Sequence, residues 1–207
     1  MRSRRLLLAP LLLAALAPLA VGCSSNSSSN GATSSNVVVP PVSKADVHSV
    51  DWRNASYSVA CVDLGGPADQ QVPVTLADGA GSTAPVTWFG SPPVRLDVAV
   101  KSVSYGDLTG DGRDEAVVDL TCTPAGSNGV AQELQVFAPG SELLGTPSLR
   151  NATGSGFAPA IKTLAVANGH LSGTALAWAR TDPHCCPSQS FPFTFTWNAE
   201  RATFDQS

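Results

Sequence analysis

The sequence predicts an all-β fold: a single antiparallel β-sandwich, barrel or curled meander that disulfide bonds stabilise. Several stretches alternate apolar and polar residues with a period of two, which is the pattern of a strand with one buried face. Pairs such as Asp78-Gly79 and Asn128-Gly129 recur between these stretches and supply the positive φ angles of tight turns. No window after residue 22 shows a sustained 3.6-residue apolar period, so we expect little helix.

Two features place individual strands. Asn168-Gly169 separates two apolar stretches and predicts a hairpin there. Pro192 cannot donate a ladder hydrogen bond, so the aromatic strand around it should begin at a sheet edge or run along one. The alternating residues are Tyr57, Val59 and Cys61; Val94, Leu96, Val98 and Val100; Val118, Leu120 and Cys122; Leu134 and Val136; and Phe191, Phe193, Phe195 and Trp197.

The N-terminus has the features of a secretory signal peptide, which we assign to residues 1–22. Three arginines in the first five residues precede an apolar stretch from Leu6 to Val21. This order keeps positive charge in the cytoplasm while the apolar stretch enters the membrane. Prolines at 10 and 18 and the modest length disfavour a permanent transmembrane helix, which needs about 20 apolar residues.

The apolar stretch ends in Leu19-Ala20-Val21-Gly22-Cys23, a sequence that resembles the bacterial lipobox. The resemblance implies cleavage before Cys23 and attachment of fatty acyl chains to this cysteine. Several chains hold a protein firmly on a membrane, whereas one chain holds it only marginally. The alternative is an ordinary signal peptide in which Cys23 is incidental.

Residues 23–42 are expected to form a tether between this anchor and a folded domain. Ser24 to Asn36 consists almost entirely of Ser, Asn, Gly, Ala and Thr and offers nothing to bury. Residues 43–207 are left as one β domain, a common single-domain length.

The charge of the processed chain disfavours nucleic-acid binding. Without residues 1–22, nine Lys and Arg remain against sixteen Asp and Glu, for a net charge near −7. No basic stripe remains that could contact phosphates or anionic lipid.

Four cysteines remain in the β domain: Cys61, Cys122, Cys185 and Cys186. In an exported protein we expect disulfide bonds, and four cysteines allow three connectivities. Adjacent cysteines bond each other only in a strained ring, so Cys185 and Cys186 should each reach a separate partner. A Cys61–Cys122 bridge with a Cys185–Cys186 bridge is the alternative. A zinc site that uses His184 and the adjacent pair is disfavoured, because zinc ligands are usually spaced two to four residues apart.

One acidic loop has the spacing of a calcium site. Positions 1, 3, 5, 7 and 9 of a calcium loop supply oxygen ligands, and Asp107, Thr109, Asp111, the carbonyl of Arg113, and Glu115 occupy them here. Calcium is therefore a possible cofactor, in a weak structural site.

Two departures favour a plain hairpin turn instead. An EF-hand loop requires Glu at position 12, where this chain has Val118, and strand-like rather than helical sequences flank the loop. The loop is closer to the Asp-rich hairpin loops of FG-GAP and integrin-type β repeats, although it occurs only once. In the alternative, Asp107 and Asp111 cap backbone N–H groups of the turn.

No common catalytic motif is present, and we expect no catalytic residues. The sequence has no G-x-S-x-G, P-loop, H-E-x-x-H or C-x-x-C pattern, and His48, His170 and His184 fall in separate turns or loops. Trp52, Trp88 and Phe89 could form an exposed binding patch, but core positions are expected for them.

Three landmarks together resemble the LppP/LprE-type lipoproteins of mycobacteria and related actinobacteria. They are the lipobox cysteine, the segment YGDLTGDGRDEAVV, and DPHCCPSQSFPFTFTWN near the C-terminus. The resemblance covers about residues 46–204. It implies a cell-envelope location and an actinobacterial source, and it carries over no functional residue.

These observations predict a lipoprotein anchored to the extracytoplasmic face of the cell membrane. Its β domain is expected to be a non-catalytic binding or structural module whose partner is an envelope protein, glycan or lipid. The alternative is an envelope hydrolase or a small-ligand carrier. A carrier would need an apolar cavity of hundreds of Å³, and a hydrolase a His or carboxylate pair that converges in a cleft.

Overall fold

Antiparallel strands make up nearly all the regular structure of the chain in a computed structural model, as the all-β prediction required. The structure describes residues 45–90, 92–149, 159–183 and 186–207, which belong to one compact unit, Val42–Ser207. The predicted signal peptide, Cys23 and the tether lie outside these residues. The strands are β1 (Ser56–Val59), β2 (Val72–Thr75), β3 (Ala80–Ser82), β4 (Leu96–Gly106), β5 (Glu115–Pro124), β6 (Ala131–Ala138), β7 (Glu142–Gly145), β8 (Ala160–Ala167), β9 (His170–Ala177), β10 (Gln189–Asn198) and β11 (Thr203–Gln206).

Three short 3₁₀ helices complete the described elements: η1 (Val47–Ser49), η2 (Trp52–Asn54) and η3 (Val62–Leu64). Aspartates at the N-caps of η1 and η2, Asp46 and Asp51, accept hydrogen bonds from backbone N–H groups two residues later. No helix in the described residues is long and apolar enough to cross a membrane.

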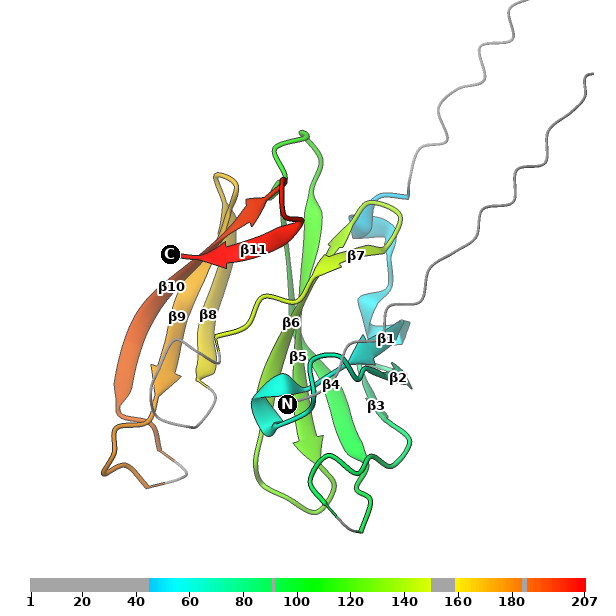
Figure 1. The fold of residues 1–207 in the computed structure, drawn as a ribbon. Helices are drawn as coiled ribbons and strands as arrows, with labels where there is room; N and C mark the ends of the chain where they lie inside the picture. The colour runs from blue at the N-terminus through cyan, green and yellow to red at the C-terminus, as the bar shows by residue number, and fades with distance from the viewer. Residues whose placement is uncertain (1–44, 91, 150–158, 184–185) are drawn as a thin grey trace, which may run out of the picture. The chain divides into compact units, whose positions relative to one another are not determined.

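The strands form three sheets, of which a five-stranded sheet is the central one. Its strand order is β3-β4-β5-β6-β7, beside a four-stranded sheet of order β11-β10-β9-β8 and a two-stranded sheet of β1 and β2. Figure 1 shows the four-stranded sheet along one side of the central sheet and β1 and β2 on its other side. The fold is a sandwich with an added third layer.

Each face of the central sheet is covered by its own hydrophobic core. One core lies under β1, β2 and the 3₁₀ helices, and the second lies under the four-stranded sheet. The fully buried members of the first core include Val59, Leu96, Val98, Val118, Leu120 and Cys122, and the second core includes Val117, Leu134, Val136, Leu171, Phe193 and Phe195.

This arrangement corrects the prediction for the two middle strands. Alternation in β5 and β6 predicted one buried and one solvent face, but β5 is buried continuously from Glu115 to Leu120 and β6 from Glu133 to Phe137. The reason is the third layer: both faces of these strands are covered by packed residues, so even their polar side chains lie inside.

The three aromatic residues for which core positions were expected differ in burial. Trp52 is buried at 5 % exposure, Trp88 packs partly buried against the first core, and Phe89 is exposed.

Cys61 and Cys122 form a disulfide bond, with their Cα atoms 6.1 Å apart. We expected Cys185 and Cys186 each to bond a separate partner, which would have left Cys61 and Cys122 unbonded to each other. That expectation is wrong for Cys61 and Cys122, which bond each other as in the alternative arrangement. The bridge joins the residue before η3 to β5 inside the first core. Closing 61 residues of chain, it stabilises the fold by about 4 kcal/mol in the chain-entropy description. Cys186 is also disulfide-bonded, and Cys185 and His184 lie outside the described residues.

Two local predictions for the four-stranded sheet are confirmed. Asn168 and Gly169, with φ angles of 53° and 77°, form the turn between β8 and β9. In β10, Pro192 pairs with Thr174 of β9 on one side. On the other side β11 pairs with β10 only from Phe195 onward, so among the described residues no strand lies beside Pro192 there. The sequence analysis did not predict β11.

The central and four-stranded sheets each contain a β-bulge, and a hydrogen bond connects the two bulges. The β4–β5 pairing shifts between Val100 and Ser102, and the β8–β9 pairing shifts between Ile161 and Thr163. The first bulge adds one residue, Lys101, whose ammonium donates a hydrogen bond to the carbonyl of Ile161 at the second bulge.

Candidate functional site

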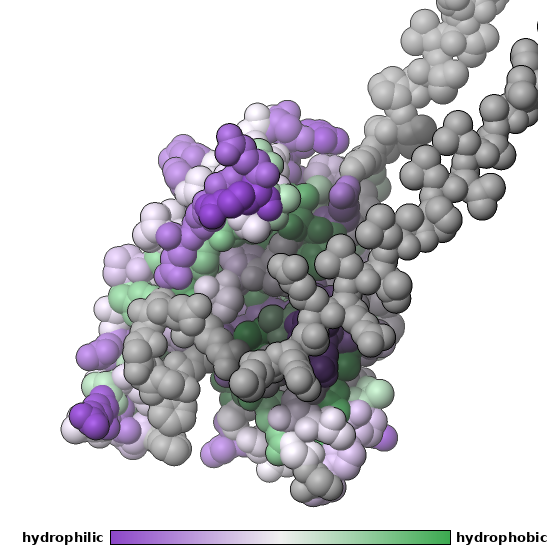
Figure 2. Space-filling view, in the orientation of Figure 1, coloured by the Kyte–Doolittle hydropathy of each residue, from purple (hydrophilic) through white to green (hydrophobic). Residues whose placement is uncertain are grey.

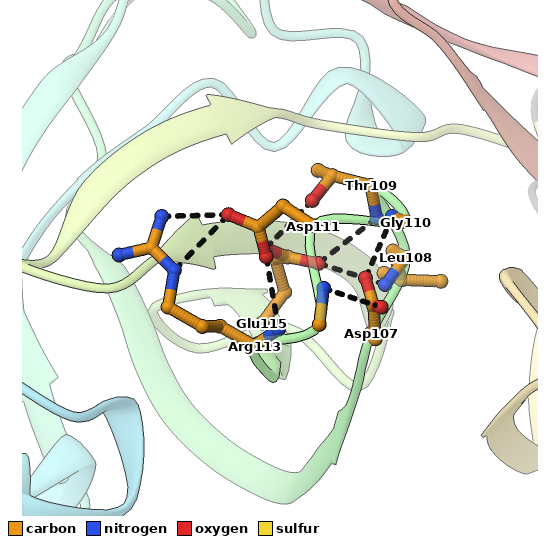
Figure 3. A network of polar contacts seen from close by, with 8 residues as sticks. Asp107, Leu108, Thr109, Gly110, Asp111, Arg113 and Glu115 are labelled. Atoms are coloured by element: carbon orange, nitrogen blue, oxygen red, sulfur yellow. Dashed lines mark hydrogen bonds and ion pairs between the residues drawn. The ribbon is translucent and has the colours of Figure 1, made fainter.

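The acidic loop connects β4 to β5, and its own carboxylates organise it. Asp107 accepts hydrogen bonds from the backbone N–H of Gly110 through Oδ1 (2.6 Å) and of Gly112 through Oδ2 (2.9 Å), as Figure 3 shows. Gly110 and Gly112 have φ angles of 79° and 83°, a conformation that glycine adopts without strain. Asp107 therefore caps the turn.

Glu115 fixes the other end of this loop. Its side chain is fully buried and accepts hydrogen bonds from the N–H groups of Leu108 (2.7 Å) and Thr109 (3.1 Å). Burial raises the pKa of the Glu115 carboxyl, and these hydrogen bonds act in the opposite direction. Leu108 packs into the second core, so the loop is held by apolar burial as well.

The outer part of the loop is an exposed ion pair. Asp111 accepts a hydrogen bond from the backbone N–H of Arg113 (2.9 Å), and its Oδ2 lies 2.6 Å from the guanidinium of the same residue. The side-chain hydrogen bond from Arg113 lowers the pKa of Asp111. Solvent screens an exposed pair of this kind, so it contributes little to stability.

These contacts give the loop the geometry of the hairpin alternative. The carboxylate oxygens of Asp107, Asp111 and Glu115 accept hydrogen bonds from the loop itself. Among the described residues, these three side chains do not bring their oxygens within 4.8 Å of one another as a group that could hold a metal ion. Thr109 directs its hydroxyl to Glu115 (3.3 Å). Calcium binding at Asp107, Thr109, Asp111, Arg113 and Glu115 remains a prediction.

The acidic loop also contacts the start of the β domain. His48 Nε2 lies 2.9 Å from Asp114 Oδ2, and the imidazole stacks on Tyr105 with ring centroids 4.2 Å apart. His170, in contrast, bonds to Thr196 in the four-stranded sheet. The structure thus brings one described histidine to a carboxylate, at an exposed position.

A buried polar network links the central sheet to the four-stranded sheet. Asp119, 1 % exposed, accepts two hydrogen bonds from the amide of Gln132 (3.0 and 2.9 Å) and lies 3.6 Å from the Lys101 ammonium. Gln132 in turn accepts a hydrogen bond from the N–H of Ile161 (2.6 Å). Burial raises the pKa of Asp119, against the hydrogen bond from Gln132 and the charge of Lys101.

A second buried network lies on the opposite face of β6. Glu133, 8 % exposed, accepts hydrogen bonds from the N–H groups of Ala60 (3.0 Å) and Cys61 (2.6 Å) through Oε2, and from Gln135 (2.7 Å) through Oε1. Gln135 also donates to the carbonyl of Ser58 (2.8 Å). Burial raises the pKa of Glu133 as well. Among the described residues, no buried side-chain polar atom lacks a hydrogen-bond partner.

A cleft opens beside β6 next to the second network. It has a volume of about 50 Å³ and lies between β6, η3, residues 146–149 and the start of β8. In the view of Figure 2, hydrophobic surface is visible between the sheets, whereas hydrophilic side chains gather over the turn between β10 and β11. The walls are mainly apolar and include Ala60, Val62, Leu134, Leu149 and Ile161, with Glu133 as a buried acidic residue.

The cleft beside β6 and the networks of Asp119 and Glu133 were not predicted from the sequence. Glu133 and Gln135 alternate with Leu134 and Val136, so they matched the pattern of a solvent face. The available signal was the adjacent strand: residues 116–118 of β5 are all apolar, which is typical of a strand buried on both sides.

Comparison with known proteins adds no relative: no protein-family model, curated protein or solved structure matches the chain.

The capping role of Asp107 can be separated from a calcium role by measuring stability with and without the ion. We expect Asp107→Ala to lower the free energy of unfolding by about 1 kcal/mol in chelator, because two N–H groups of the turn lose their acceptor. Urea unfolding should give the same loss at millimolar calcium. Asp111→Ala is the matched control and should cause a smaller loss than Asp107→Ala, because its ion pair is exposed. If Asp107→Ala were as stable as the wild type in chelator and less stable only with calcium, Asp107 would be a calcium ligand and not a cap of the turn.

The buried carboxyls predict how stability depends on pH. Because burial raises the folded-state pKa of Glu115, Asp119 and Glu133, the protonated forms are favoured in the folded protein. Their contribution is full below the pKa of the unfolded chain and is lost as the pH rises through the folded pKa. We expect the free energy of unfolding to fall as the pH is raised from 4.5 to 7, and to fall less steeply in Asp119→Asn. A rise over this interval in urea titrations contradicts the assignment.

Proposed function

We propose that this chain is a lipoprotein anchored at Cys23 to the extracytoplasmic face of the cell membrane, with a β domain that acts as a non-catalytic binding module. The observation that carries the proposal is the signal-like segment of residues 1–22, which ends in the lipobox-like sequence at Cys23. The resemblance to LppP/LprE-type lipoproteins supports the same location. Its partner would be an envelope protein, glycan or lipid.

The disulfide chemistry of the domain supports an exported location. Cys61–Cys122 and the bonded Cys186 require oxidised thiols, which persist in extracytoplasmic compartments and are rare in the cytosol. The processed chain has a net charge near −7, so attachment through fatty acyl chains accounts for membrane binding better than attraction to anionic lipid.

The roles of the buried carboxylates favour binding over catalysis. Glu115 holds the acidic loop, and Asp119 joins the central and four-stranded sheets, so both are used in support of the fold. The cleft beside β6 is about 50 Å³, whereas a small-molecule site usually has 300–1,000 Å³. This size suits one side chain of a partner better than an enclosed whole ligand.

The anchor can be tested by removing the thiol that would carry it. We expect the full chain to fractionate with membranes in a bacterium that processes lipoproteins. Cys23→Ser should move it to the soluble fraction or leave it as uncleaved precursor, because no sulfur remains to acylate. Ser24→Ala is the matched control and should stay in the membrane fraction. Mass spectrometry that finds Cys23→Ser cleaved at the same bond and equally membrane-bound would refute the lipid anchor.

A further inference from the structure

The cleft beside β6 has the composition of a pocket for one long amphipathic side chain. Most of its lining is apolar, with Val62, Leu134 and Ile161 among the walls, and its volume of about 50 Å³ corresponds to a few water molecules. Glu133 and Ala60, whose N–H donates to the Glu133 carboxylate, both line this cleft. An occupant therefore meets hydrocarbon surface, the buried acidic group of Glu133 and the half-buried one of Asp63.

Glu133 is a buried carboxylate that has hydrogen bonds but no cation. None of the ion pairs between described residues includes it, although it is only 8 % exposed. Asp119 provides the internal comparison, because it is equally enclosed and has Lys101 at 3.6 Å. Burial raises the pKa of the Glu133 carboxyl, and only hydrogen bonds act in the opposite direction, without a neighbouring cation. A positive charge brought into the cleft would therefore be stabilised by this carboxylate.

The number of lone pairs on Glu133 that still lack a hydrogen-bond donor determines which kind of cation fits. A carboxylate has about four lone-pair sites, and Glu133 uses three of them for Ala60, Cys61 and Gln135. A guanidinium fork needs one free site on each oxygen, but Oε2 already accepts two N–H groups. An ammonium group acts as a point charge and needs only one site, and a four-carbon stem suits apolar walls.

We propose that the cleft beside β6 receives a lysine side chain of a protein partner, with the methylene stem against Ala60 and Val62 and the ammonium at Glu133. This inference rests on the proposed binding function and names the chemistry that the site recognises. The net charge near −7 of the processed chain adds long-range attraction for a basic partner.

The test uses lysine-side-chain probes and the processed chain, residues 23–207, with Cys23→Ser so that no acyl chain can be attached. Amide resonances of Ala60 and Leu134 are followed by NMR during titration with N-acetyl-lysine methylamide. Its Nζ-acetylated form and the corresponding arginine derivative serve as comparison ligands. We expect saturable shifts with the lysine probe and at least tenfold weaker binding of both others.

Three variants connect that binding to the cleft. Glu133→Gln should weaken the lysine probe at least tenfold, whereas Glu115→Gln, which alters a buried carboxylate whose partners Leu108 and Thr109 do not line the cleft, should leave its affinity within twofold. Ala68→Trp should also abolish binding, because Ala68 lies at the exposed rim of the cleft and a large ring there fills it without disturbing the core.

Equal binding of the lysine probe and its acetylated form, or unchanged affinity in both Glu133→Gln and Ala68→Trp, would overturn the inference. The fractionation of Cys23→Ser and Ser24→Ala tests the anchor separately. Membrane attachment with no lysine binding refutes the pocket and leaves the anchored module intact.

Discussion

The constraint on which the structure depends is that its central sheet is covered on both faces. β5 and β6 contribute apolar residues to two separate cores, and water reaches neither face of their middle residues. Polar side chains in such a place cost several kcal/mol unless they find partners, so each one must be part of a hydrogen-bonded network. The positions of Glu115, Asp119 and Glu133 follow from this requirement.

Two of these carboxylates, Asp119 and Glu133, connect the central sheet to another layer. Asp119 reaches the four-stranded sheet through Gln132 and Lys101, and the bulge at Lys101 supplies the extra residue that turns the ammonium toward that network. Glu133 caps the N–H groups beside the disulfide of the opposite layer. The layers are thus connected by specific polar contacts as well as by apolar packing, which fixes their register.

The sequence was informative where a local pattern determines the structure. The hairpin at Asn168-Gly169 follows from two residues that accept positive φ, and the edge position of Pro192 follows from a missing N–H group. Layer number does not follow from such patterns, because Glu133 and Gln135 look the same facing water as facing a second core. The disulfide pairing and the cleft beside β6 depend on contacts between distant segments, which no local spacing encodes.

Native-state hydrogen exchange followed residue by residue tests the doubly covered sheet most directly. The account predicts that amides of β5 and β6 exchange most slowly, through global unfolding alone, while β8, whose outer side has no partner strand in the described sheet, exchanges sooner through local opening. If amides from Ala116 to Leu120 exchanged as fast as those of β8, water would have access to the middle of the central sheet, and the three-layer account would be contradicted.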